Sequence, residues 1–238
     1  MAVAERVYSK LENQKIASKY EEVFDIQEEL GIIEPVKNRS SGQVFIPHRP
    51  VIRNEENVTT KIRPVFNCSL KVGNAPSLNE AAFPGIDLMN NLLSLVMYFR
   101  NNNYVILADI VKAFLQVRLS LESDRNKFCF FRKINGKFVA YRYNTIIFGF
   151  VSSPFILNYI IKHHLKKFSD DKCNEMLNRC LYVDNLIYTS NDVNQLINLY
   201  GESINRMDKG VFNLRSWNSN NKELQEIMKQ DEKYVTHI

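Results

Sequence analysis

The segment YVILA at residues 104–108 restricts the fold more than any other feature of the chain. Five consecutive apolar residues fit a strand that is buried on both faces. Asp109 follows the run directly. An acid in this place is costly unless it is solvated, paired or bound to a cation. The sequence therefore predicts a central strand that carries an acid at its end.

Hairpins, further extended runs and helices surround this strand. An Asn-Gly pair at 135–136 predicts one tight hairpin, and Asp184-Asn185 joins the two runs of a second hairpin. Extended runs are expected at 44–52, 61–66, 127–132, 138–143, 179–183 and 186–189, and helices at 3–31, 86–100, 153–168 and 192–210. Because strands pair locally and helices connect them, the pattern predicts an α+β fold with helices on one face of an antiparallel sheet.

The expected helix at 86–100 has one strongly apolar side, which predicts a buried face. That side is formed by Ile86, Met89, Leu92, Leu93, Val96 and Phe99. Asp192 is a predicted N-cap of the last expected helix. From Asn218 the composition becomes polar, and residues 221–238 are expected to be a polar C-terminal tail with no packing partner.

Composition narrows the class of protein. The 238 residues are 45% hydrophobic and carry a net charge of +5, which indicates a folded core of one large or two small domains and permits an anionic partner. The four cysteines are scattered, so neither a disulfide framework nor a zinc site is expected. The N-terminus has no apolar signal segment, and the longest apolar stretch is interrupted by Gly149 and Pro154. We expect an intracellular protein with no membrane partner.

A second acid has a comparable position. Asp184 is at the tip of the expected hairpin LYVDNLIY. If the hairpin and the central strand are neighbours, Asp109 and Asp184 meet, and two carboxylates at one site call for a cation such as Mg²⁺. The alternative is structural, because an Asp after a strand often caps a turn or a helix.

Five ordered blocks carry a family resemblance. The blocks are KIRPVF (61–66), LADIVKAFLQV (107–117), FGFVSSPF (148–155), YVDN (182–185) and GVFNLRSWNSN (210–220). In this order and spacing the chain resembles a reverse transcriptase. PHRPVIR, SLNEAAFPG, KHHL and FNLRSWNSN resemble the Bel/Pao group of LTR retrotransposons in particular. The likeness runs from about Gly31 to Asn220.

The resemblance implies a set of catalytic and metal-binding residues. Asp109 matches the first catalytic metal ligand, and the backbone carbonyl of Ile110 matches a ligand of the same metal. Residues 182–185 match the family tetrapeptide tyrosine-x-Asp-Asp, so Asp184 is the implied second ligand and Asn185 occupies the place of the second acid. The implied cofactor is a pair of Mg²⁺ ions, with Mn²⁺ as the substitute.

The resemblance also implies substrate-binding residues. Phe114 matches the aromatic gate against the ribose 2′-hydroxyl, and Arg63 with Lys61 matches the fingers residues that hold the triphosphate. The full implied set is Lys61, Arg63, Ile110, Phe114, Gln116, Phe148, Gly149 and Tyr182. Each has a structural alternative: Phe114 and Phe148 are also good core residues, and Gly149 also suits a turn.

The implied architecture is the fingers and palm of a right-hand polymerase, with an antiparallel palm sheet backed by helices and no thumb. Fingers are expected at 1–85 and 119–150, and palm at 86–118 and 151–220. The implied partners are an RNA or DNA template with its primer and a dNTP, while the oligomeric state is not indicated. The expected location is the cytoplasm, within particles if the chain is part of a polyprotein.

Three departures from the family pattern predict impaired polymerase activity. Asn185 and Asn67 stand where the family has Asp, and no thumb follows Asn220. The main prediction is an RNA-directed DNA polymerase domain of a transposable element, weakened at Asn185. The alternative is an inactive remnant that binds nucleic acid non-specifically. A template-independent phosphotransferase that uses the same two acids is a third possibility.

Overall fold

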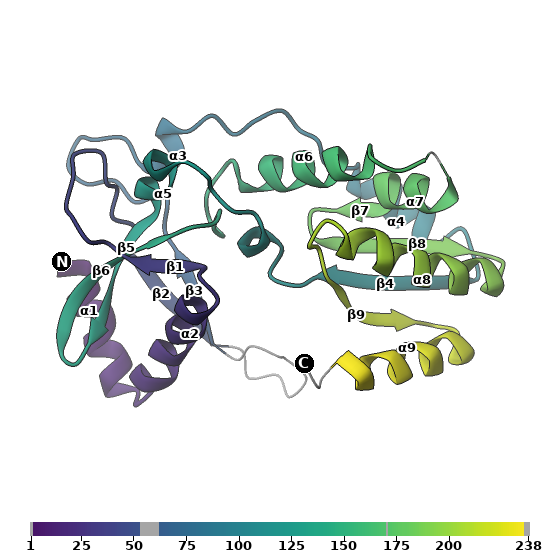
Figure 1. The fold of residues 1–238 in the computed structure, drawn as a ribbon, viewed down its shortest axis with the longest axis horizontal. Coiled ribbons are helices and arrows are strands. Elements are labelled where there is room, and N and C mark those ends of the chain that lie inside the picture. Colours follow the sequence, from purple (N-terminus) through teal and green to yellow (C-terminus); the bar gives the residue numbers. More distant parts are fainter. Residues whose placement is uncertain (1, 53–61, 170, 236–238) are drawn as a thin grey trace. The chain divides into compact units, whose positions relative to one another are not determined.

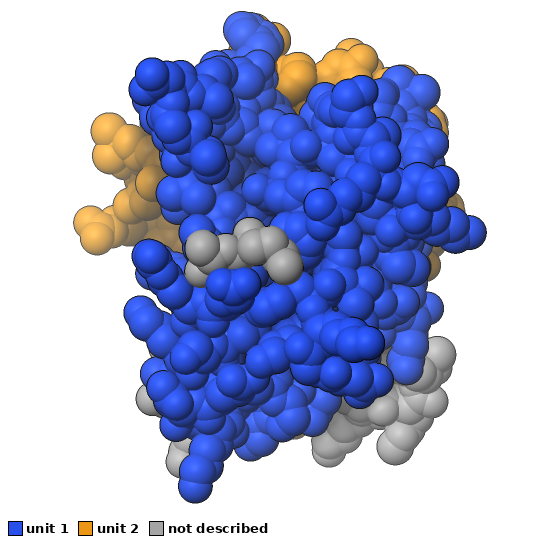
Figure 2. Space-filling model, turned by 90° about the vertical axis from the view of Figure 1, so that its left-hand side faces the viewer, with its two compact units in different colours: residues 1–84, 117–153 blue, residues 85–116, 154–238 orange. Residues whose placement is uncertain are grey.

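The computed structural model describes residues 2–52, 62–169 and 171–235. The chain forms two compact units, which Figure 2 colours separately. Unit 1 comprises Met1–Pro84 and Val117–Ser153, and unit 2 comprises Gly85–Gln116 and Pro154–Ile238. Helices and antiparallel sheets occur in both units, so the predicted α+β class is confirmed.

Unit 1 contains a three-stranded sheet of order β1-β6-β5 and a separate two-stranded ribbon, β2-β3, all antiparallel (Figure 1). Its elements are α1 (Ala2–Asn13), α2 (Ala17–Glu29), β1 (Ile33–Pro35), β2 (His48–Ile52), β3 (Ile62–Phe66), α3 (Leu78–Ala81), α5 (Glu122–Arg125), the 3-10 helix η2 (Asn126–Phe128), β5 (Cys129–Ile134) and β6 (Lys137–Tyr143). The single helix expected at 3–31 is two helices, because the chain turns at Lys15, where φ is +56°.

The hairpin predicted at the Asn-Gly pair is confirmed. Asn135 and Gly136 have φ values of +49° and +78° and connect β5 to β6. Positive φ at both central positions is the requirement of a type I′ turn, which asparagine and glycine tolerate best. Local turn chemistry therefore fixes the register of this pair of strands.

Unit 2 contains one antiparallel sheet of order β7-β8-β4-β9. Its elements are α4 (Leu92–Phe99), β4 (Tyr104–Ile110), the 3-10 helix η1 (Ala113–Gln116), α6 (Ser153–Leu165), α7 (Lys172–Cys180), β7 (Leu181–Tyr182), β8 (Asn185–Ser190), α8 (Val193–Asp208), β9 (Leu214–Ser219) and α9 (Lys222–Val235). The predicted central strand is confirmed as β4, which pairs with a strand on each side. Asp192 caps α8 by accepting hydrogen bonds from the backbone of Asn194 and Gln195.

Two expectations about unit 2 are wrong. The helix expected at 86–100 is shorter, and Leu95 is its only buried residue. The apolar side assigned to the core is exposed instead, with Leu93 at 69% and Ile86 at 65%. A helix is present as the spacing of the apolar residues predicts, but the face that packs toward the core is the one that contains Leu95.

The segment expected to be an unpacked tail is largely helical. Leu224 and Met228 of α9 are buried, and α9 packs on β9 and α8. These apolar positions lie four residues apart, a helical spacing that the polar average of the segment obscured. None of the described helices is long and apolar enough to cross a membrane.

Candidate active site

The pairing of β4 with β8 joins the two predicted acids. Asp109, near the end of β4, lies directly opposite Asn185, the first residue of β8. The backbone N–H of Ile110 donates to the carbonyl of Asp184 over 2.8 Å. Residues that are far apart in the sequence therefore meet at one end of the unit 2 sheet.

The turn between β7 and β8 presents Asp184. Its two loop residues are Val183 and Asp184, one position earlier than the loop predicted from the sequence, because Asn185 pairs with Tyr182. Val183 has a φ of +57°, a backbone conformation that a β-branched residue rarely adopts. The side-chain amide of Asn185 donates to Oδ1 of Asp184 over 2.9 Å. Asn185 thus contacts the carboxylate beside it instead of adding a second charge.

A basic residue on the other neighbouring strand faces the first acid. Arg215 of β9 lies opposite Asp109, and its Nε is 3.6 Å from Oδ2 of Asp109. Both side chains are about one-third exposed. Sequence reasoning did not assign Arg215 any role, although it lies in one of the five blocks. The sequence shows a basic residue in an expected block, but it does not reveal the register of β9 against β4. The pairing of Arg215 with Asp109 could therefore not be predicted.

The donor set at this end of the sheet suits a hard divalent cation. Asp109 and Asp184 supply carboxylates, Asn185 an amide oxygen and Ile110 a backbone carbonyl. Mg²⁺ usually takes one or two carboxylates and completes its shell with water and substrate phosphates. Within the described ranges, no three His, Cys, Asp or Glu residues cluster closely enough to hold a metal. The sheet end thus offers two carboxylates, Asp109 and Asp184, with the uncharged Asn185 beside them.

The remaining predicted residues of unit 2 are close in the sequence to Asp109 or to Asp184. Phe114 and Gln116 belong to η1, and Tyr182 ends β7. Phe114 is only 6% exposed. The side-chain amide of Gln116 donates to the carbonyl of Val111 over 3.2 Å. The roles predicted for these residues toward a nucleotide stay predictions.

In unit 1, Gly149 is required by its backbone. Its φ is +93°, and a Cβ built there would lie 2.5 Å from the carbonyl oxygen of Phe66. Asn79 holds the same loop by donating to the carbonyl of Gly149 and accepting from the N–H of Val151, each over 2.9 Å. Phe148 is 44% exposed. Gly149 therefore has the structural role in a turn that the sequence offered as an alternative, and its role in substrate binding stays a prediction.

The predicted triphosphate residues are described in part. Arg63 lies on β3 opposite Val51, and Lys61 is outside the described residues. Asn67, just after β3, accepts a hydrogen bond from the N–H of Ser69 over 3.2 Å. The amide oxygen accepts here as a carboxylate oxygen would, because both aspartate and asparagine make this type of turn.

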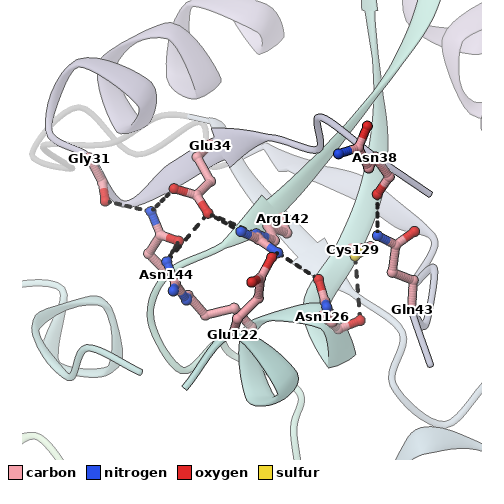
Figure 3. Close-up of polar contacts among 10 residues, drawn as sticks. Gly31, Glu34, Asn38, Gln43, Glu122, Asn126, Cys129, Arg142 and Asn144 are labelled. Atoms are coloured by element: carbon pink, nitrogen blue, oxygen red, sulfur yellow. Dashed lines mark hydrogen bonds and ion pairs between the residues drawn. The ribbon is translucent and has the colours of Figure 1, made fainter. Parts of the chain in front are cut away.

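Unit 1 also contains a polar hollow of about 750 Å³ beside β1 and β6. Figure 3 shows polar contacts among residues that line it, where Arg142 donates to Glu34, Glu122 and Asn126 over 2.7 Å each. Because both carboxylates are already paired with Arg142, this network ties β1, α5 and β6 together. We assign it a structural role.

Comparison with known proteins identifies the family. The family model described as "Reverse transcriptase (RNA-dependent DNA polymerase)" matches residues 50–216, more than half of the chain. The chain belongs to the reverse transcriptase family. The match contains both β4 and the β7–β8 hairpin, so the two acids lie inside the family region. No curated protein matches the chain.

Solved structures share the fold of this reverse transcriptase domain. A foamy viral protease–reverse transcriptase in complex with double-stranded DNA matches with a TM-score of 0.61 at 14% identity, over 82% of this chain and 29% of that one. Prototype foamy virus protease–reverse transcriptase, as a selenomethionine-labelled mutant and in native form, matches with TM-scores of 0.59 and 0.56 at 15% and 14% identity. Both matches cover 81% of this chain and 22% of those chains. The chain thus spans less than a third of the length of these proteins. The TM-scores confirm the predicted polymerase fold.

Proposed function

We propose that unit 2 carries the nucleotidyl-transfer site of a Bel/Pao-type reverse transcriptase and that Asn185 impairs it. The observation that supports this most directly is the β4–β8 register, which puts Asp109 opposite Asn185 and next to Asp184. Two carboxylates at one sheet end, inside the family region, are the type of ligand by which phosphoryl-transfer sites hold divalent cations. The assignment to the Bel/Pao group rests on the sequence blocks alone.

In the proposed reaction, a primer 3′-hydroxyl attacks the α-phosphate of a dNTP on an RNA or DNA template, and pyrophosphate leaves. Asp109, Asp184 and the carbonyl of Ile110 would hold the metal. Mg²⁺, or Mn²⁺ in its place, supplies charge neutralisation and activates the hydroxyl when bound. Asn185 adds an oxygen without a charge, so this chain holds a divalent cation less tightly than a site with a third carboxylate.

The other predicted residues keep their proposed roles toward substrate. Unit 1 corresponds to the fingers in this proposal, with Arg63 and Lys61 for the triphosphate and Phe148 and Gly149 against the nucleotide and template. Unit 2 corresponds to the palm. There, Phe114 discriminates against ribose, and Gln116 and Tyr182 line the nucleotide site.

Primer extension tests the proposal. The full chain and its Asn185→Asp variant are compared on a primed RNA template, in Mg²⁺ and in Mn²⁺. We expect at least about a tenfold faster rate for Asn185→Asp, because the restored carboxylate would strengthen binding of the divalent cation that offsets the negative charge developing on the phosphoryl group. Asn198→Asp is the matched control, since it adds the same charge on the exposed side of α8. Adding Asp109→Asn to the Asn185→Asp chain should abolish extension.

Equal and robust extension by both chains contradicts the expected impairment. The alternative function, an inactive remnant that binds nucleic acid non-specifically, is favoured by Asn185, an uncharged residue that lies opposite Asp109 and donates to Asp184. It predicts template binding without extension, even in Asn185→Asp.

A further inference from the structure

Arg215 faces the same carboxylate that the proposed metal needs. Its Nε lies 3.6 Å from Oδ2 of Asp109 and is buried without a hydrogen-bond partner. The pair is thus held by charge and by strand pairing rather than by a hydrogen bond, since 3.6 Å exceeds ordinary hydrogen-bond distances.

An irregularity in β9 brings Arg215 to this place. Leu107 lies opposite Asn218, and Asp109 lies opposite Arg215, so two steps along β4 match three steps along β9. The extra residue forms a β-bulge, and within it Ser216 has a φ of +53°. In a regular ladder Ser216 would stand opposite Asp109, and the Arg215 side chain would point to the other face.

The burial pattern of β9 agrees with this geometry. Leu214 and Trp217 are buried at 5% and 9% exposure, although three positions separate them. Strict alternation would bury either one but not both. The bulge keeps both in the core and puts Arg215 and Ser216 together on the more exposed face. A left-handed serine is costly, and such conformations persist where the surrounding structure enforces them, often at functional sites.

We propose that Arg215 is a positioning residue that acts as the internal counter-ion of Asp109. This inference rests on the proposed function, because it concerns the same metal site. In the metal-free protein the guanidinium neutralises Asp109 and holds its carboxylate at the sheet end. A divalent cation that binds Asp109 meets the positive charge of Arg215, which lowers its affinity. With Asn185 uncharged, the two acids and Arg215 leave a net charge of −1.

Manganese binding by the full chain tests the inference without any need for polymerase activity. The dissociation constant of Mn²⁺ is measured by electron paramagnetic resonance for the unchanged protein and for Arg215→Gln. Loss of the opposing charge should tighten Mn²⁺ binding about fivefold, the size expected for a partly exposed ion pair. Arg215→Lys keeps the charge and should change the constant less than about twofold.

The matched control is Arg179→Gln. Arg179 lies on α7 of the same unit, where it pairs with Glu175 at 2.7 Å and is largely exposed. Its removal changes the net charge by the same amount, so the Mn²⁺ constant should stay unchanged. If Arg215→Gln does not fold, as judged by circular dichroism, Arg215→Met retains the apolar stem and makes the same prediction.

The outcomes separate the two ideas. Mn²⁺ binding that is unchanged or weakened in a folded Arg215→Gln or Arg215→Met chain overturns the counter-ion role while the proposed function stands. An equal gain in Arg179→Gln also overturns it, because net charge alone would then explain the effect. If no variant binds Mn²⁺, including Asn185→Asp, both the inference and the metal site of the proposed function fail.

Discussion

At the scale of single residues, the site depends on backbone conformations that its side chains do not favour. Val183 and Ser216 both have positive φ, and they flank the two acids from the β7–β8 turn and from β9. A hairpin with positive φ at its first loop position normally has glycine there. Strain of this kind is maintained by the surrounding strands, and here it coincides with the residues of the candidate site.

Replacing Val183 with glycine should stabilise the protein. Relief of the left-handed valine conformation outweighs the entropy that glycine adds to the unfolded chain, and we expect a gain of about 1 kcal/mol in the free energy of unfolding. Urea denaturation measures it. Val139→Gly in β6 is the contrast, because φ there is not positive and the same change should cost about 1 kcal/mol. Equal losses in both variants would contradict the strain at Val183.

At the scale of elements, one buried arginine holds a helix to the sheet of unit 1. Arg132 of β5 is almost fully buried and pairs with Glu21, Asp25 and Glu28, which lie on one side of α2. The Nη1–Glu28 distance is 2.9 Å and the Nε–Glu21 distance is 3.0 Å. Three carboxylates at helical spacing meet one guanidinium, so the orientation of α2 on the sheet is set by charge as well as by its buried Phe24.

Removal of this arginine should be strongly destabilising. Arg132→Met keeps much of the side-chain volume but leaves three carboxylates without their shared partner, and we expect a loss of about 3 kcal/mol in the free energy of unfolding. The neighbouring Lys133 is the matched control. Its pair with Glu12 at 2.6 Å is partly exposed, so Lys133→Met should cost under about 1 kcal/mol. Urea denaturation of both variants is the measurement, and similar losses would show that Arg132 contributes no more than a surface pair.

At the scale of the whole molecule, the sequence was informative where local signals decide the structure. The continuous apolar run predicted β4, and the Asn-Gly pair predicted the β5–β6 hairpin. The meeting of Asp109 with Asp184 also followed, because neighbouring central strands leave few alternatives. Arg215 was missed because its position depends on a bulge, and a shift of one residue reverses every side chain beyond it. The buried face of α4 was missed because that helix is apolar on more than one side.

Long-range packing also changes the pKa of one histidine, His48, which the sequence did not reveal. His48 of β2 is buried in the aromatic core of unit 1, and burial lowers its pKa to about 4 despite its hydrogen bond to Phe131. The carbonyl of Phe131 can only accept, so Nε2 donates to it over 2.8 Å, and Nδ1 accepts from the hydroxyl of Tyr20 over 2.6 Å. Both ring nitrogens are therefore hydrogen-bonded in the neutral form of the histidine, and burial is what disfavours the charged form.

Acidification should therefore destabilise the protein before the carboxylates titrate. In the unfolded chain His48 has a pKa near its ordinary value of 6.5 and binds a proton that the folded state rejects down to about pH 4. Its contribution to stability is full above pH 6.5 and is lost as the pH falls toward 4, with a total of about 3 kcal/mol. Urea denaturation at pH 7.0, 5.5 and 4.5 measures the loss. His48→Gln cannot titrate, so its stability should change little across this window even if it is lower at every pH. An unchanged pH dependence in His48→Gln would assign the acid sensitivity to other groups.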